Sequence, residues 1–268
     1  MSKSGAVWAA VSGVTIGEAW LRRDEPKSLD LVAKYRDALA QLERGVPFAY
    51  AVGRVGFRTL DLKIDRRALI PRPETEGLVD LVLARCTTGL AADIGTGSGC
   101  IALSLAVEGS FDRVVAVEQS PNAAALAREN VRSVAPVTPV EIREGNLLAP
   151  LVDKGERYRV IVSNPPYLSG ADYADLDRSV ADFEPREALV SGVDGLDATR
   201  EIFAGARTLL EPGGLLAIEI DERRVDAVRD IAIASGWENI SIHNDLFGYP
   251  RYAMARMTSG PWPGDKED

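Results

Sequence analysis

The pattern of apolar and polar positions changes character along the chain. Before residue 45, apolar residues recur at helical spacing, most clearly from Leu29 to Leu42, and Ser28 is in position to cap that helix. A Gly-Val-Pro sequence at 45–47 then breaks the helical pattern. We therefore predict a small N-terminal helical domain over residues 1–53.

The next segment predicts a hairpin and a stiff linker. Short apolar runs occupy 55–58 and 60–64, and the second alternates apolar and polar residues as a half-buried strand does. Pro71 and Pro73 restrict the chain that follows, and a helix begins at Glu74 or Thr75. We assign 54–73 to the hairpin and linker, 74–257 to a second domain, and 258–268 to a disordered tail.

From residue 88 onward, short apolar runs alternate with helical patterns, which is typical of a parallel sheet with covering helices. The predicted strands are 91–94, 114–117, 140–143, 160–162, 215–220, 240–242 and 252–257. The predicted helices are 100–107, 121–134, 196–210 and 222–235. The sequence thus predicts an α/β fold, in which loops at the carboxyl ends of the strands carry the chemistry.

Composition narrows the class of protein. The 268 residues are 46% apolar, which is ample for a core, and the net charge of −9 opposes broad contact with a nucleic-acid backbone. No window has the apolar length of a membrane helix, and the N-terminus lacks a secretory pattern. The two cysteines have neither metal-binding nor redox spacing. We expect a cytoplasmic protein without metal, whose partner is a small molecule or a basic protein.

A glycine-rich loop follows the first strand of the predicted sheet. Gly95, Gly97 and Gly99 let the backbone approach a ligand at the start of a helix. A dinucleotide fingerprint requires its third glycine where Cys100 stands, so the spacing favours S-adenosylmethionine over NAD. Glu118, at the end of the next strand, suits ribose hydroxyls. The carboxylate of Asp93 could bind the ligand's ammonium group or brace the loop.

A second motif ends the strand at 160–162. In Asn164-Pro165-Pro166-Tyr167 neither proline can donate to a sheet ladder, so the strand must stop at Asn164 in a stiff turn. The Asn164 amide, backbone carbonyls and the ring of Tyr167 suit a planar –NH2 group. Carbonyl oxygens accept its two hydrogens while the ring packs against its plane.

Such a turn can align an amide nitrogen for methylation. An amide nitrogen is a poor nucleophile because its lone pair is delocalised, whereas a methyl sulfonium is highly reactive, so alignment and electrostatics dominate. Asn164 Oδ1 and the Pro165 carbonyl could direct the nitrogen and stabilise its developing charge. No strong base is needed, and the single histidine, His243, lies outside every motif.

Together these motifs resemble the HemK/PrmC family of protein-(glutamine-N5) methyltransferases, which modify peptide-chain release factors. The resemblance rests first on three sequences, Pro71-Arg72-Pro73-Glu74-Thr75-Glu76, Asp93-Ile94-Gly95-Thr96-Gly97-Ser98-Gly99 and Asn164-Pro165-Pro166-Tyr167. Further matches are Gly45-Val46-Pro47, Phe183-Glu184-Pro185, Asp194-Gly195-Leu196-Asp197, Glu211 through Glu219, and Asp245-Leu246-Phe247-Gly248 with Arg251. The similarity extends over roughly residues 43–257.

The resemblance implies a class I S-adenosylmethionine-dependent methyltransferase: a Rossmann-like, seven-stranded, mostly parallel sheet behind an N-terminal helical domain that docks the substrate. The implied cofactor residues are Asp93, Gly95, Thr96, Gly97, Ser98, Gly99, Glu118, Asn146, Leu147 and Asn164. The implied substrate residues are Arg72, Glu74, Asn164, Pro165, Pro166 and Tyr167, of which Asn164, Pro165 and Tyr167 are catalytic. The implied partner is a release factor with its Gly-Gly-Gln glutamine, and we expect a monomer without direct nucleic-acid contact.

Several positions depart from the family pattern. Asn146 stands where the family usually has Asp, and Leu147 replaces a residue that is commonly aromatic. Asp221 and Arg224 stand where the family has glycine and glutamine. The region before Gly45 is about half the family's usual length, so we expect weaker docking of the substrate.

Three other functions remain open on the sequence. An adenine-N6 methyltransferase would present the same –NH2 geometry to the turn, but it must flip a base and hold a polyanion, which the acidic balance opposes. A binding protein could keep the shape without turnover. A diverged enzyme could methylate an amide in another protein or in a small molecule.

Overall fold

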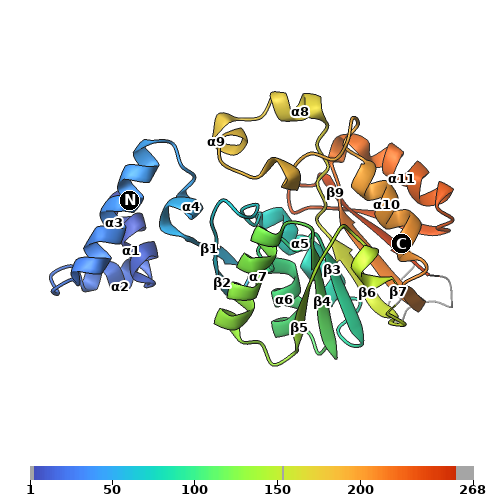
Figure 1. The fold of residues 1–268 in the computed structure, drawn as a ribbon, viewed down its shortest axis with the longest axis horizontal. Helices are drawn as coiled ribbons and strands as arrows, with labels where there is room; N and C mark the ends of the chain where they lie inside the picture. Colours follow the sequence, from blue (N-terminus) through green and yellow to red (C-terminus); the bar gives the residue numbers. More distant parts are fainter. Residues whose placement is uncertain (1–2, 153, 258–268) are drawn as a thin grey trace.

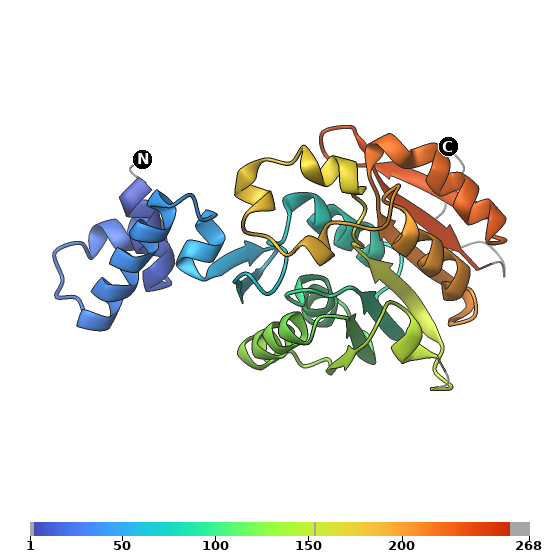
Figure 2. The same ribbon diagram turned by 45° about the horizontal axis from the view of Figure 1, so that its top comes forward.

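The computed structural model describes residues 3–152 and 154–257. A group of N-terminal helices leads through a hairpin to a sheet with helices on both faces (Figure 1). Figure 2 shows the N-terminal helices standing to one side of the sheet, with the hairpin between them. The tail 258–268, predicted to be disordered, lies outside the described residues.

The N-terminal region is helical, as predicted, but it consists of several short helices. These are α1 (Lys3–Ser12), α2 (Ile16–Leu21), α3 (Leu29–Glu43) and α4 (Phe48–Val52). Ser28 caps α3 as expected, because its side chain accepts a hydrogen bond from the Leu31 N–H at 3.2 Å. Gly13, with φ of 67°, separates α1 from α2.

The predicted hairpin is confirmed. Strands β1 (Arg54–Phe57) and β2 (Leu60–Lys63) pair antiparallel, and in β2 the leucines are buried while Asp61 and Lys63 are exposed. The Asn130 side chain in α7 (Pro121–Val134) binds both the N–H and the carbonyl of Lys63, at 2.8 and 3.0 Å. The hairpin is therefore fixed to the sheet domain as well as to the N-terminal helices.

The main sheet has seven strands in the order β5-β4-β3-β6-β7-β9-β8, parallel except for β9, which is antiparallel to both neighbours. The strands are β3 (Leu90–Ile94), β4 (Arg113–Glu118), β5 (Val140–Glu144), β6 (Tyr158–Ser163), β7 (Leu210–Glu219), β8 (Asn239–Asn244) and β9 (Pro250–Arg256). The chain starts this sheet at β3, builds β4 and β5 on one side, and then crosses to β6 on the other. This reversal creates a switch point at the carboxyl ends of β3 and β6.

Helices cover both faces of the sheet. Those on one face are α5 (Pro73–Leu83), α6 (Cys100–Glu108) and α7, and those on the other are α10 (Asp197–Ala206) and α11 (Val225–Ala234). Consecutive strand residues alternate between the two cores: Val160 packs with the first set and Ile161 with the second. Burial on both faces explains why the inner strands β4 and β6 are rich in consecutive apolar residues.

Short helices fill the connections. They are α8 (Gly170–Ala174), α9 (Arg178–Ala181), and the 3-10 turns η1 (Ala149–Leu151), η2 (Arg186–Ala188) and η3 (Glu222–Arg224). Both α8 and α9 belong to the segment that follows the Asn-Pro-Pro-Tyr turn and lie over the sheet's carboxyl edge in Figure 2.

Some predicted boundaries were wrong. Helix α5 begins at Pro73 and not at Glu74 or Thr75, because the fixed φ of proline suits the first helical position. Strand β7 begins at Leu210, which pairs with Tyr158 before an irregularity in the ladder, whereas the prediction began at Leu215. Helix α10 ends at Ala206, and the predicted helix 222–235 is a 3-10 turn followed by α11.

Candidate active site

The switch point brings together the motifs that the sequence singled out. The glycine loop follows β3, Glu118 ends β4, and Asn164 follows β6 directly. Since β3 lies between β4 and β6 with all three parallel, these residues meet at one edge of the sheet. The structure therefore brings the three predicted groups together at the carboxyl ends of β3, β4 and β6.

The glycine loop leaves its backbone open. Gly95, Gly97 and Gly99 all have positive φ, at 72°, 56° and 87°. A Cβ at Gly95 would meet nothing within 4 Å, so this position faces open space, and at Gly97 the nearest atom would be Ala68 Cβ at 3.9 Å. The N–H groups of Gly95 and Thr96 both bind the Val117 carbonyl at 2.9 Å, which ties the loop to β4. A ligand can thus approach the backbone closely without displacing a side chain.

Glu118 connects the loop to the start of α7. Its half-buried carboxylate accepts hydrogen bonds from the Gly97 N–H at 2.8 Å and from the Ser120 N–H at 2.9 Å. A carboxylate has about four acceptor positions. Glu118 can therefore fix the loop and still accept hydrogen bonds from a diol.

Asp93 lies beneath the loop and is fully buried. Its Oδ2 accepts hydrogen bonds from Thr96 Oγ1 at 2.6 Å and the Ala102 N–H at 3.1 Å. Its Oδ1 has no hydrogen-bond partner within the described residues. Burial raises the pKa of Asp93 to about 7, against the hydrogen bond from Thr96. Asp93 thus braces the loop with one oxygen and leaves the other for a donor.

The loop after β5 reaches the same edge. The Gly145 N–H binds the Glu118 carbonyl at 2.9 Å, which brings the exposed Asn146 and the half-buried Leu147 beside β4. Leu147 has φ of 42°, an uncommon conformation for a residue other than glycine. The structure therefore places both residues, which the resemblance assigned to the cofactor, at the same edge of the sheet as Glu118.

Behind the Asn-Pro-Pro-Tyr turn lies a polar chain that the sequence did not predict. Asn164 Nδ2 donates to Thr75 Oγ1 at 3.0 Å, and the Thr75 hydroxyl donates to Glu219 Oε2 at 2.7 Å. The Tyr167 hydroxyl makes a long contact of 3.5 Å with Glu219 Oε1. Thr75 and Glu219 are each only 2% exposed. Glu219 thereby contacts Tyr167 at one end of the turn directly and Asn164 at the other end through Thr75.

Burial changes the acid–base properties of this chain of groups. It raises the pKa of Glu219 to about 7, while the hydrogen bond from Thr75 and the charge of Arg251 lower it. Burial and the neighbouring Glu219 also raise the pKa of the Tyr167 phenol, so Tyr167 stays protonated at neutral pH. In the sequence, Glu219 is a charged residue directly after the apolar run 215–218 and the last residue of the matched segment that begins at Glu211, but neither observation assigns it a role.

Arg72 and Glu74, which the resemblance placed in the substrate site, make structural contacts. Arg72 Nη2 pairs with Glu184 Oε1 at 2.6 Å, and Glu184 Oε2 also accepts from the Ile70 N–H at 3.2 Å. The Glu74 carbonyl accepts a hydrogen bond from Tyr252 Oη at 2.6 Å. Glu184 is buried and lies in the segment after the turn, so its pairing with Arg72 connects that segment to the start of α5.

Asp221 and Arg224, which depart from the family pattern, are paired with each other in an ion cluster. Arg224 also pairs with Asp172 in α8, and Arg223 pairs with Asp172 at 3.0 Å. The hydrogen bonds from Ser169 lower the pKa of Asp172 most, and the ion pair with Arg224 lowers it further. Asp221 and Arg224 therefore hold α8, which begins three residues after Tyr167, against the segment that follows β7.

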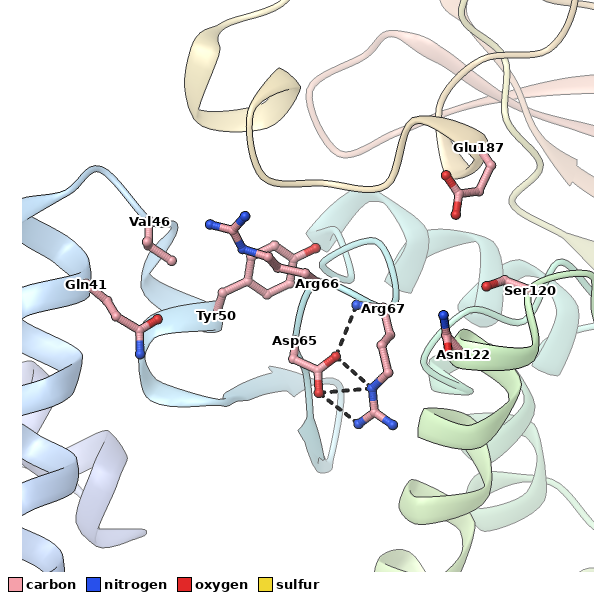
Figure 3. A pocket seen from close by; sticks show the side chains of 9 residues that line it. All are labelled: Gln41, Val46, Tyr50, Asp65, Arg66, Arg67, Ser120, Asn122 and Glu187. Atoms are coloured by element: carbon pink, nitrogen blue, oxygen red, sulfur yellow. Dashed lines mark hydrogen bonds and ion pairs between the residues drawn. The ribbon is translucent and has the colours of Figure 1, made fainter.

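A cavity of about 640 Å³ adjoins the Glu118 side of the site (Figure 3). Its lining residues come from α3, α4 and the connection between them, the linker after β2, the start of α7, and η2: Gln41, Val46, Tyr50, Asp65, Arg66, Arg67, Ser120, Asn122 and Glu187. Ser120 connects it to the site, because its N–H is bound by Glu118. The cavity lies where the N-terminal helices face the sheet domain.

Comparison with solved structures agrees with this fold. A methyltransferase from Pyrococcus furiosus superposes with a TM-score of 0.55 at 19% identity, covering 81% of this chain and 96% of that one. The hMettl16 catalytic domain, solved with a MAT2A 3′UTR hairpin, gives 0.63 at 17% identity, covering 90% and 95%. At these identities the likeness shows the class I methyltransferase fold alone, and it confirms the predicted fold class.

Sequence comparison identifies the family. Residues 74–181 match the methyltransferase small domain family. Release factor glutamine methyltransferase from Xylella fastidiosa (strain Temecula1) is 40% identical over 251 residues, covering 92% of this chain and 88% of that protein. The enzyme of that name from Moorella thermoacetica is also 40% identical, covering 87% and 83%. The longer alignment extends beyond the predicted limits of 43–257, so the similarity includes part of the N-terminal helices. This chain therefore belongs to the family of release factor glutamine methyltransferases.

Proposed function

We propose that this chain transfers a methyl group from S-adenosylmethionine to the side-chain amide nitrogen of a glutamine, in the Gly-Gly-Gln motif of a peptide-chain release factor. The observation that carries the proposal is 40% identity to a release factor glutamine methyltransferase over 92% of the chain. The geometry of the Asn-Pro-Pro-Tyr turn supports it, because the turn offers acceptors to an –NH2 group. The adenine and binding-protein alternatives have no comparable support.

The residues at the switch point fit the cofactor. Asp93 Oδ1 is a buried acceptor without a partner in the described structure, and Glu118 retains free acceptor positions. An ammonium group and ribose hydroxyls are the donors they would bind. Gly95 would let the ligand contact the backbone. We assign the remaining positions of the 95–99 loop and the Asn146-Leu147 turn to the same ligand.

S-adenosylmethionine supplies a methyl group on a positively charged sulfur. The chain's own residues must then align the acceptor nitrogen. Asn164 Nδ2 is bound to Thr75, which leaves Oδ1 to accept one amide hydrogen, and the Pro165 carbonyl accepts the other. The Tyr167 ring packs against the amide plane, with Pro166 holding the turn rigid.

This arrangement also stabilises the transition state. Transfer of the methyl group from sulfur to nitrogen would place positive charge on the nitrogen, and the Asn164 Oδ1 and Pro165 carbonyl oxygens would stabilise it. The nitrogen then loses one proton to solvent, so no strong base is required. His243 does not take part: it lies on edge strand β8, where its Nε2 is 2.8 Å from Ser241 Oγ.

We further propose that residues 1–53 dock the protein substrate, joined through 54–73 to the catalytic domain at 74–257. The cavity between the two parts supports this, because it extends from the N-terminal helices to Ser120, whose N–H donates to Glu118. Arg66, which lines this cavity, lies over the Phe183 ring, with its Cζ 4.6 Å from the ring centroid. Arg66→Glu should raise the KM for intact release factor and leave the KM for a short Gly-Gly-Gln peptide unchanged. Equal effects on both substrates would contradict docking at this cavity.

We propose that the enzyme acts as a cytoplasmic monomer without direct nucleic-acid contact. The net charge of −9 supports the last point. No helix in the described part of the chain has the length and apolar character needed to cross a membrane. Light scattering and a gel-shift assay with ribosomal RNA test these points. A stable dimer or a salt-sensitive shift would contradict them.

Transfer of labelled methyl groups tests the main proposal. Purified release factor is incubated with the enzyme and labelled S-adenosylmethionine, beside a release factor whose motif glutamine is replaced by glutamate. We expect label in the first protein only. Equal labelling of both would place the methyl group elsewhere, and labelling of neither would favour a diverged substrate.

A further inference from the structure

The buried groups behind Asn164 have only one consistent direction of hydrogen donation when Glu219 is ionised. A carboxylate can only accept, so the Thr75 hydroxyl must donate its single hydrogen to Glu219 Oε2, 2.7 Å away. The Thr75 oxygen then has lone pairs to offer but no hydrogen. It accepts from Asn164 Nδ2 at 3.0 Å, and this contact turns Asn164 Oδ1 away from Thr75.

We propose that Glu219 and Thr75 are positioning residues that fix which end of the Asn164 amide faces the substrate. The inference rests on the proposed function, in which Asn164 Oδ1 accepts a hydrogen from the glutamine –NH2. Neither residue touches the substrate. Their role is to keep an acceptor, and not the Asn164 –NH2 donor, pointed at the substrate nitrogen.

Protonation of Glu219 would reverse this order. A protonated carboxyl can donate to Thr75 Oγ1, and the Thr75 hydroxyl can then donate to Asn164 Oδ1. The Asn164 –NH2 group would turn toward the substrate, where donor would meet donor. Turnover should therefore fall when Glu219 gains a proton, although no step of the reaction passes through that proton.

The surroundings of Glu219 set the pH at which its carboxylate takes up a proton. Burial raises its pKa to about 7, and the hydrogen bond from Thr75 and the charge of Arg251 oppose that rise. Arg251 itself pairs with Glu222 and Asp245, both at 3.4 Å. Titratable and charged groups on four elements interact electrostatically with Glu219. These elements are α5, α6, the Asn-Pro-Pro-Tyr turn and β9, and the groups are Glu74, Cys100, Tyr167, Arg251 and Tyr252.

Kinetics of matched variants test the proposal. Thr75→Val keeps the shape of the side chain but loses the hydroxyl, and we expect kcat to fall about 10–100-fold, as for groups that orient metal ligands from behind. The KM for release factor should change little, since docking occurs elsewhere. Thr75→Ser restores a hydroxyl and should recover most of the lost kcat. Melting temperature and cofactor affinity of each variant exclude loss of fold.

The pH profile gives a second kinetic readout. In the wild type, kcat should decline as pH falls through about 7, where Glu219 takes up its proton. Glu219→Gln cannot titrate, so its kcat should be lower and independent of pH in this range. A folded Thr75→Val with wild-type kcat would overturn the proposed positioning role of Thr75 and Glu219. So would a kcat of Glu219→Gln that declines at acidic pH as the wild-type kcat does.

A spectroscopic readout does not depend on turnover. In 15N-labelled protein, the side-chain amide resonance of Asn164 is identified by its loss in Asn164→Asp. We expect this resonance to shift with pH near 7 in the wild type and to stay fixed in Glu219→Gln. If the resonance does not shift with pH in the wild type, the positioning role of Thr75 and Glu219 is refuted. If the resonance shifts as expected while release factor stays unmethylated, the positioning role stands and the proposed function fails.

Discussion

Replacing Asn164 by alanine should abolish most methyl transfer while the fold remains intact. Asn164 lies at the end of β6 and is half-buried, so the substitution opens no large cavity. It removes one acceptor for the substrate amide and one hydrogen bond to Thr75. These two losses act on different quantities, the rate of transfer and the free energy of unfolding.

The structure sets the expected magnitudes. Loss of one preorganised polar group at a reacting centre typically costs about 10²–10³-fold in rate, or about 3–4 kcal/mol. The lost hydrogen bond costs about 1 kcal/mol of stability. Thr75 still donates to Glu219, so no buried donor is left unpaired. For a protein of this size, that corresponds to a decrease in melting temperature of about 2–4 °C.

Single-turnover methylation of release factor measures the rate directly. Melting temperature and cofactor affinity are determined on the same preparation, and affinity should fall much less than the rate because the glycine loop and Glu118 remain. Asn239→Ala, at an exposed asparagine on β8, is a matched control. If Asn164→Ala folds, binds cofactor and transfers methyl at the wild-type rate, then the turn only terminates a strand and the mechanism is refuted.

Three other predictions address the cofactor, the ring and the buried carboxyl groups. Glu118→Ala should weaken S-adenosylmethionine binding by about 1–3 kcal/mol in calorimetry, and NAD should not bind; undiminished affinity would remove Glu118 from the site. Tyr167→Phe should reduce the transfer rate only slightly, because packing requires the ring; a loss as large as that of Asn164→Ala would contradict this. Asp93 and Glu219 have folded-state pKa values of about 7, above their ordinary 3.8 and 4.5, so the folded protein binds more protons in between. Stability should therefore decrease as pH rises from about 5 to 8, by up to about 3 kcal/mol per group, and thermal melts of Glu219→Gln should show a smaller decrease.

Local sequence signals were sufficient for most of the sheet domain. Helix α7 was predicted with the correct limits, because Ser120 caps it and Pro121 fits its first position. The strands at β3, β4 and β6 were found because apolar runs end at glycine, glutamate or proline. The N-terminal helices were predicted as a single region, since their boundaries at Gly13 and near residue 22 lie within one broadly helical pattern.

The site was only partly predictable, for a physical reason. The glycine loop, Glu118 and Asn164 each follow a strand, so topology alone brings them together. The contacts from Thr75 to Asn164 and Glu219 span 89 and 144 residues of sequence and depend on how α5 packs beside β7. Nothing local to either segment determines that packing, and the pairing of Glu184 with Arg72 over 112 residues was missed for the same reason.

The most direct test of the central claim is the fragment mass spectrum of release factor after incubation with this enzyme and isotopically labelled S-adenosylmethionine. The proposed function predicts one labelled methyl group on the side-chain amide nitrogen of the glutamine in the Gly-Gly-Gln motif, and about 10²–10³-fold slower labelling when the Asn164→Ala enzyme is used. A labelled methyl group on another residue, or unmodified release factor despite measured cofactor binding, would contradict the claim.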